Sequence, residues 1–152
     1  MKILLVYATY SNSTLMASEV LKEELESAGH TVQLVQVRDS QPKTWSEHDL
    51  VILASPSWDF NGQQGLYHED YEDLKNRLGD MTLLGQRMAI MGLGDHTFTY
   101  YCGCVDHLEE MVQKLQAKLV IPSLKLDQYY LNEATCQKQI REWARVLISR
   151  MA

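Results

Sequence analysis

Six consecutive residues with hydroxyl or amide side chains form the stretch of this chain best suited to binding chemistry. They are Thr9, Tyr10, Ser11, Asn12, Ser13 and Thr14. An apolar run over 2–7 precedes them and predicts a buried strand, and apolar residues at helical spacing follow them as far as Gly29. A helix start of this kind favours anions, because the first helical N–H groups have no partner within the helix and the hydroxyls add donors.

The loop over 9–14 contains no Lys or Arg and no glycine. A nucleoside triphosphatase needs a Lys and several glycines at this place, so that class of enzyme is disfavoured. The pattern instead fits a single phosphate monoester held by neutral donors. Ser and Asn residues that only cap the helix are the alternative, and composition alone leaves both interpretations open.

Two further loops combine turn-forming residues with large aromatic side chains. The first, over 55–62, follows an apolar strand over 50–54 and contains Trp58. The second, over 92–101, follows a strand over 86–91 and contains Phe98. Aromatic side chains in such loops have few packing reasons to be there, so they are candidates for stacking on a flat ligand. Trp58 as a cap on the edge of the core is the alternative.

Strands and helices alternate along the chain, which predicts an α/β fold in a single domain, 1–152. We expect strands over 2–7, 31–37, 50–54, 86–91 and 118–126, with helices over 15–28, 66–78, 104–117 and 133–151. This alternation implies right-handed βαβ units in a three-layer, doubly wound, five-stranded parallel sheet. All three unusual loops then lie at the carboxyl edge, where such sheets bind ligands. A flat, phosphorylated ligand follows, and flavin mononucleotide (FMN) is the economical candidate.

Charge and length exclude several classes of partner. The chain has 152 residues, with 20 acidic and 14 basic side chains and a net charge of -6. That balance disfavours nucleic acid and anionic membranes and favours a basic protein partner. No apolar run approaches the roughly 20 residues of a membrane span, and the first strand starts too early for a signal peptide. We therefore expect a cytoplasmic protein.

Cysteines and histidines give little support for a metal or hydrolase site. Cys102, Cys104 and Cys136 cannot form a closed disulfide set, and no ligand set has zinc spacing. Metal or redox chemistry at Cys102 and Cys104 is a weaker alternative, because free cysteines usually behave as small buried hydrophobes. The five histidines lie in no recognisable nucleophile context. We expect no metal and no catalytic residues.

The chain resembles the flavodoxins along its whole length. Residues 9–14 resemble their phosphate loop T-x-T-G-x-T, Ser57 and Trp58 resemble their first flavin-stacking loop, and 92–103 closely resembles the second. The similarity is nearest to the short-chain bacterial flavodoxins, because no extra loop interrupts the fifth strand. It implies a flavodoxin-like strand order 2-1-3-4-5 and a monomer with non-covalently bound FMN. The implied function is low-potential electron transfer between redox partner proteins, a reductase donor and an oxidoreductase acceptor.

The resemblance also implies roles for individual residues of this chain. Thr9, Ser11, Asn12, Ser13 and Thr14 would hold the phosphate with the Tyr10 backbone, Trp58 would cover the inner ring face, and Phe98 the outer face. Backbone groups would meet the polar ring edges. The cofactor-binding residues expected beyond the phosphate loop are Ser55, Pro56, Ser57, Trp58, Asp59, Leu93, Gly94, Asp95, Phe98, Tyr100, Tyr101 and Cys102.

Two residues depart from the family pattern. Asn12 stands where the family has Gly, which is tolerable because Asn reaches left-handed backbone conformations readily. Asp59 stands where flavodoxins commonly carry a Gly whose peptide turns over to accept a hydrogen bond from the reduced flavin. A residue other than Gly makes that rotation costlier by roughly 1 kcal/mol or more.

Three alternatives remain beside the electron carrier. An FMN-dependent NAD(P)H or quinone oxidoreductase of the same fold is disfavoured, because the sheet and helices use most of the chain and no basic cluster lies beside the loops. A phosphoacceptor receiver domain needs acidic residues after the first strand and an Asp ending the third, where this chain has Thr9 and Ser55. A flavin-free interaction module of the same fold is the third alternative, and Asn12 and Asp59 are the residues that favour it.

Overall fold

The structure is a computed structural model that describes residues 1–60 and 62–152. Asn61, part of the loop predicted over 55–62, lies outside the described residues. Strands and helices alternate over most of the chain. In order, the elements are β1 (Lys2–Tyr7), α1 (Ser13–Ser27), β2 (Thr31–Gln36), η1 (Val37–Asp39), η2 (Pro42–Glu47), β3 (Leu50–Pro56), β4 (Trp58–Phe60), β5 (Gln63–Leu66), α2 (Glu69–Leu78), β6 (Arg87–Gly94), α3 (Gly103–Lys114), β7 (Lys118–Leu119), β8 (Leu124–Asp127) and α4 (Glu133–Met151).

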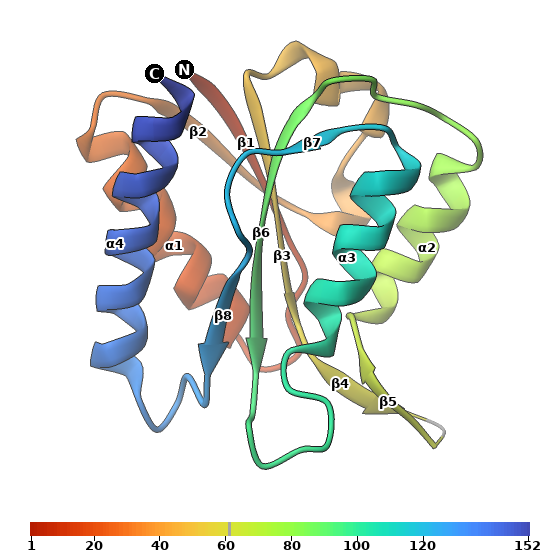
Figure 1. The fold of residues 1–152 in the computed structure, drawn as a ribbon, viewed down its shortest axis with the longest axis vertical. Helices are drawn as coiled ribbons and strands as arrows, with labels where there is room; N and C mark the ends of the chain where they lie inside the picture. Colours follow the sequence, from red (N-terminus) through yellow and green to blue (C-terminus); the bar gives the residue numbers. More distant parts are fainter. Residues whose placement is uncertain (61) are drawn as a thin grey trace.

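A parallel sheet forms the centre of the molecule. Its strand order is β2-β1-β3-β6-β7, and β8 also pairs with β6. Helices α1 and α4 cover one face, and α2 and α3 cover the other (Figure 1). The predicted three-layer, doubly wound fold with order 2-1-3-4-5 is thus confirmed, with β7 and β8 as two parts of the fifth strand.

The sheet separates two hydrophobic cores. Successive side chains of a strand point to opposite faces. Accordingly, Ile3 and Leu5 of β1 pack in the core beneath α1 and α4, whereas Leu4 and Val6 pack in the core beneath α2 and α3. All four are at most 3% exposed, so both faces of the central strand are dry. This burial fixes the register of β1 and therefore the place where the loop after it begins.

Two elements differ in kind or continuity from the sequence prediction, and other bounds shift by up to three residues, as where β6 extends into the loop predicted over 92–101. The fifth strand is broken, because Pro122 in the connection over 120–123 has no N–H with which to continue a ladder. The helix predicted over 66–78 begins only at Glu69, and Leu66 instead closes a small antiparallel hairpin of β4 and β5. The loop predicted over 55–62 is therefore largely strand. Among the described residues, no helix is both long and apolar enough to cross a membrane.

Two glycines fix the position of the β4–β5 hairpin. A Cβ atom added to Gly103, the first residue of α3, would lie 2.6 Å from the Cα of Gly65 and would overlap the Gly65 carbonyl oxygen. The carboxylate of Asp59 also accepts a hydrogen bond from the Gly65 amide at 2.9 Å. The hairpin, which carries Trp58, is thereby pressed against the start of α3.

The Gly103–Gly65 contact yields a stability prediction. Helix propensity alone favours Ala over Gly by up to about 1 kcal/mol. We expect Gly103→Ala to be destabilising instead, by about 1–2 kcal/mol, because the backbone of Gly65 cannot move aside cheaply. Urea denaturation of Gly103→Ala would measure this change, with Ser27→Ala at an exposed position of α1 as the control. A more stable Gly103→Ala protein would contradict the close contact.

Candidate ligand-binding site

A cavity of about 480 Å³ opens at the carboxyl edge of the sheet. Its size is in the range of small-molecule and cofactor sites. Loops that follow β1, β3, β6 and β8 enclose it. The lining residues are Thr9, Tyr10, Ser11, Ser13, Thr14, Pro56, Ser57, Trp58, Asp59, Leu93, Gly94, Asp95, Phe98, Tyr100, Gln128, Tyr129, Tyr130 and Leu131.

One end of the cavity is formed by the turn from β1 into α1. Asn12 caps the helix with φ 71°, a left-handed conformation, and its side chain makes no capping hydrogen bond. The Asn12 carbonyl accepts the first helical bond, from Met16, at 2.9 Å. Asn12 therefore adopts a left-handed conformation, which Asn reaches more readily than most residues, as the sequence predicts. The first N–H groups of the helix have no partner within it, and Ser13 and Thr14 of this turn line the cavity.

Three hydroxyls at this end have no hydrogen-bond partner. The Oγ atoms of Thr9, Ser13 and Thr14 are buried and unpaired among the described residues. Buried polar atoms are nearly always paired, and leaving one unpaired costs about 1–3 kcal/mol. Three such atoms in one turn at the start of a helix are a donor set that lacks its acceptor. A phosphate group fits this set, because its oxygens accept several hydrogen bonds at once.

The other part of the cavity is aromatic. Tyr10, Trp58 and Phe98 are 40%, 45% and 56% exposed, although they are large apolar side chains. The ring of Tyr10 lies 4.6 Å from that of Trp58 and 4.0 Å from that of His68, centroid to centroid. Phe98 belongs to the opposite loop. Exposed rings from two loops at one cavity are suited to a flat ligand.

His68 packs against the ring of Tyr10. It is 4% exposed and caps α2, because its Nδ1 accepts a hydrogen bond from the Asp70 amide at 3.0 Å. Burial lowers the pKa of His68 below its usual value of 6.5, although the nearby Asp70 and a hydrogen bond to the Thr9 backbone act in the opposite direction. The neutral His68 ring therefore joins the start of α2 to the loop over 9–14.

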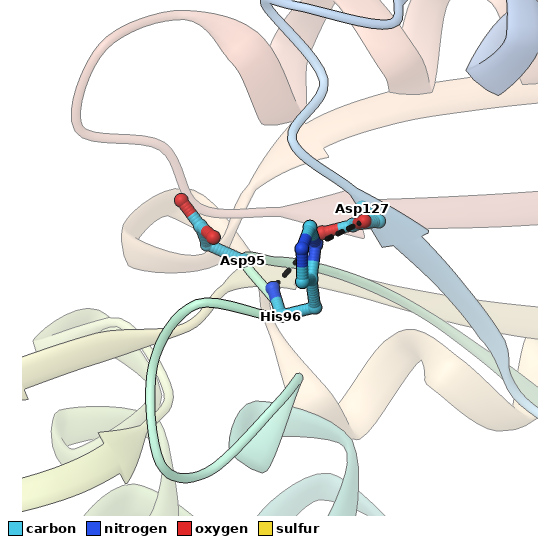
Figure 2. Close-up of side chains that lie close together, drawn as sticks. All are labelled: Asp95, His96 and Asp127. Atoms are coloured by element: carbon cyan, nitrogen blue, oxygen red, sulfur yellow. Dashed lines mark hydrogen bonds and ion pairs between the residues drawn. The ribbon is translucent and has the colours of Figure 1, made fainter.

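The loop after β6 is held by side-chain hydrogen bonds. The Thr97 hydroxyl and amide donate to Asp95 Oδ1 at 2.6 and 2.9 Å, and they lower the pKa of Asp95. The His96 amide donates to Asp127 Oδ1 at 3.0 Å, and the His96 ring lies 2.7 Å from Asp127 Oδ2 (Figure 2). These contacts join the loop that carries Phe98 to the end of β8.

Charge in the cavity is of one sign. Among the described residues that line it, only Asp59 and Asp95 are charged, and no Lys or Arg contributes. An anionic group bound here would depend on hydroxyls and amides, and additional negative charge on the ligand would be disfavoured by both carboxylates.

Fourteen of the eighteen residues predicted for the site line this one cavity. The other four do not, and they are Asn12, Ser55, Tyr101 and Cys102. Ser55 is fully buried, and its side chain holds the loop by accepting a hydrogen bond from the His68 amide at 3.0 Å. Cys102 is also buried, at the left-handed cap of α3, and Tyr101 packs against the core.

Burial raises the pKa of the Cys102 and Cys104 thiols to about 12. Both therefore stay protonated at neutral pH and are poor nucleophiles. This state disfavours the redox alternative for the two cysteines.

Residues 128–131 also line the cavity, although the sequence analysis did not predict them as site residues. A signal was present, because two adjacent tyrosines, Tyr129 and Tyr130, follow the last strand at its carboxyl end. The same rule that selected Trp58 and Phe98 would have selected them.

Comparison with known proteins decides the family. The family model described as flavodoxin matches residues 5–143. The chain belongs to the flavodoxin family. The flavodoxin of Maridesulfovibrio salexigens is 31% identical over 128 residues, which span 83% of this chain and 86% of that protein.

Solved structures of flavodoxins have the same fold as this chain. The structure of oxidised flavodoxin 2 from Bacillus cereus has 25% sequence identity and a TM-score of 0.88, and the match covers 99% of each chain. The flavodoxin of Fusobacterium nucleatum bound to flavin mononucleotide has 20% identity and a TM-score of 0.82, over 98% of each chain. The resemblance read from the sequence is thus confirmed.

The unpaired Thr14 hydroxyl yields a prediction on stability. We expect Thr14→Val to raise the free energy of unfolding of the ligand-free flavodoxin by about 1 kcal/mol, because it removes a buried polar atom without a partner and conserves shape. The matched control is Thr44→Val, since the Thr44 hydroxyl donates to the Gln41 carbonyl at 2.8 Å. Urea denaturation of both variants tests this, and a Thr14→Val protein less stable than Thr44→Val would refute it.

The lowered pKa of His68 predicts a dependence of stability on pH. Because the unfolded state binds the proton more tightly, stability is lost as the pH falls below about 6.5. His68→Asn can keep the helix cap and does not titrate. We expect this variant to lose less stability than the wild type between about pH 7.5 and about pH 5.5, measured by urea denaturation. Equal losses would show that His68 does not contribute; His30, whose pKa is also lowered, is present in both proteins.

Proposed function

We propose that this chain binds FMN non-covalently in the cavity and carries electrons between redox partner proteins. The observation that carries the proposal is the set of three unpaired hydroxyls, of Thr9, Ser13 and Thr14, in a cavity that also contains the rings of Trp58 and Phe98. One end suits a phosphate and the other a flat ring system. The related flavodoxin of Fusobacterium nucleatum is bound to the same cofactor.

The phosphate would be held by neutral donors. The hydroxyls of Thr9, Ser13 and Thr14 would each gain the acceptor they lack, and the free amides at the start of α1 would add to them. Ser11 and the Tyr10 backbone complete the predicted set. Asn12 would act through its left-handed backbone, because its side chain does not line the cavity.

The rings of Trp58 and Phe98 would stack on the flavin and keep water from its two faces. Bound FMN would supply one-electron redox chemistry, and the surrounding protein sets the potential. Here Asp59 and Asp95 oppose the addition of negative charge, and the apolar rings reduce its solvation. Both effects favour a low reduction potential.

Electron carriage is the proposed role, in preference to an enzyme activity. The described residues lining the cavity provide no cation for a second dinucleotide. Exposed acidic residues at the start of α2, among them Glu69 and Glu72, lie near this rim, since the Glu69 amide donates to the Tyr10 hydroxyl at 3.3 Å. Such a surface steers basic partners toward the site. A monomeric, single-domain protein of the cytoplasm is part of the same proposal.

FMN binding yields the test of this function. We expect the protein, mixed with FMN and passed through gel filtration, to keep flavin absorbance in the protein peak. Trp58→Ala should weaken FMN binding by about 1–3 kcal/mol, because a stacked ring is lost, and should raise the second one-electron reduction potential. Fluorescence titration and potentiometry measure the two quantities.

Phe60→Ala is the control for the Trp58 substitution. Phe60 lies in the same strand and is 56% exposed, but it does not line the cavity. We expect it to leave FMN affinity within about twofold of the wild type. A wild-type protein that elutes without flavin would overturn the proposed function. Unchanged affinity and potential in Trp58→Ala would overturn the role of the ring.

A further inference from the structure

The turn after β8 is anchored to the opposite wall of the cavity. The Gln128 amide donates to the Gly94 carbonyl at 2.9 Å, and the Gln128 side chain donates to Asp95 Oδ1 at 3.2 Å. The preceding Asp127 holds His96, as described above. The Leu131 amide closes the turn on the Gln128 carbonyl at 2.9 Å. The segment over 127–131 is thus fixed before it reaches the phosphate end.

Tyr130 extends from this anchored turn to the phosphate loop. Its hydroxyl donates to the Ser11 carbonyl, across 119 residues of sequence. The side chains of Ser11 and Ser13 lie close enough to lower the pKa of Tyr130, although Ser13 does not reach hydrogen-bond geometry. The ring itself lines the cavity and is 62% exposed, so core packing does not account for its place.

We propose that Tyr130 is a positioning residue for the phosphate end of the site and makes this chain selective for a phosphorylated flavin over one that lacks the phosphate. The inference rests on the proposed FMN function. The carbonyl that Tyr130 holds directly precedes Asn12, the residue with φ 71°. Fixing that carbonyl fixes the turn through Asn12 and therefore the directions of the Ser13 and Thr14 hydroxyls.

The contribution follows from the cost of preorganisation. Without the Tyr130 hydroxyl, the loop must be ordered when the phosphate binds, and binding bears that entropic cost. The loss of one such hydrogen bond corresponds to a roughly three- to tenfold weaker affinity. Only ligands whose phosphate contacts the loop over 9–14 should lose affinity, because Trp58 and Phe98 would hold the ring of the flavin.

Equilibrium titrations of the apoprotein with FMN and with riboflavin test this selectivity. We expect Tyr130→Phe to weaken FMN binding roughly three- to tenfold and to leave riboflavin binding within about twofold. Inorganic phosphate should also raise the melting temperature of the wild-type apoprotein more than that of Tyr130→Phe. Tyr67→Phe is the matched control, since it removes a hydroxyl bonded to Glu72 at 2.9 Å, outside the cavity.

The possible outcomes separate the two proposals. Equal weakening of FMN and riboflavin, or unchanged FMN binding, in Tyr130→Phe would overturn the role of Tyr130 while leaving FMN binding by the wild type intact. If the wild type binds no FMN, but phosphate raises its melting temperature more than that of Tyr130→Phe, the proposed cofactor is wrong and the role of Tyr130 at the phosphate end is supported. A wild type that neither binds FMN nor gains thermal stability from phosphate would overturn both the proposed function and the role of Tyr130. Urea midpoints of the variants show whether folding has changed.

Discussion

Unpaired hydrogen-bond donors at the start of α1 are the feature on which the site depends. A helix start leaves its first N–H groups free, and here three buried hydroxyls are left free beside them. Such an arrangement costs folding free energy, so it is stable only because β1, buried on both faces, fixes where the turn begins. The stability of the sheet offsets the cost of these unpaired groups, which gain an acceptor under the proposed function when a phosphate binds.

The rest of the structure arranges flat side chains around that loop. The hairpin of β4 and β5 carries Trp58, and its position is set by the contact of Gly65 with Gly103. The loop after β6 carries Phe98 and is held by Thr97 and by Asp127. Each aromatic side chain is therefore exposed on a support that is itself fixed, which reduces the entropy lost on binding.

Much of this could be predicted from the sequence, and the failures have physical causes. Buried strands such as the one predicted over 50–54 are continuous apolar runs, and the rule that ligands bind at the carboxyl edge then brought distant loops together. The hairpin of β4 and β5 was missed because most of its described residues are exposed and show no alternation of apolar and polar side chains. Ser55 and Cys102 do not line the cavity, and sequence position does not tell which residues of a loop are buried behind it. Their predicted contact with the ligand stays a prediction. Tyr130 was missed although it follows the last strand at its carboxyl end; only its contact with Ser11 depends on tertiary structure alone.

A crystal structure of the protein with FMN would test the central claim most directly. The account predicts phosphate oxygens within hydrogen-bonding distance of the Thr9, Ser13 and Thr14 hydroxyls, with the ring between Trp58 and Phe98. A phosphate bound to lysine or arginine side chains elsewhere, or a ring outside the two aromatic loops, would contradict it.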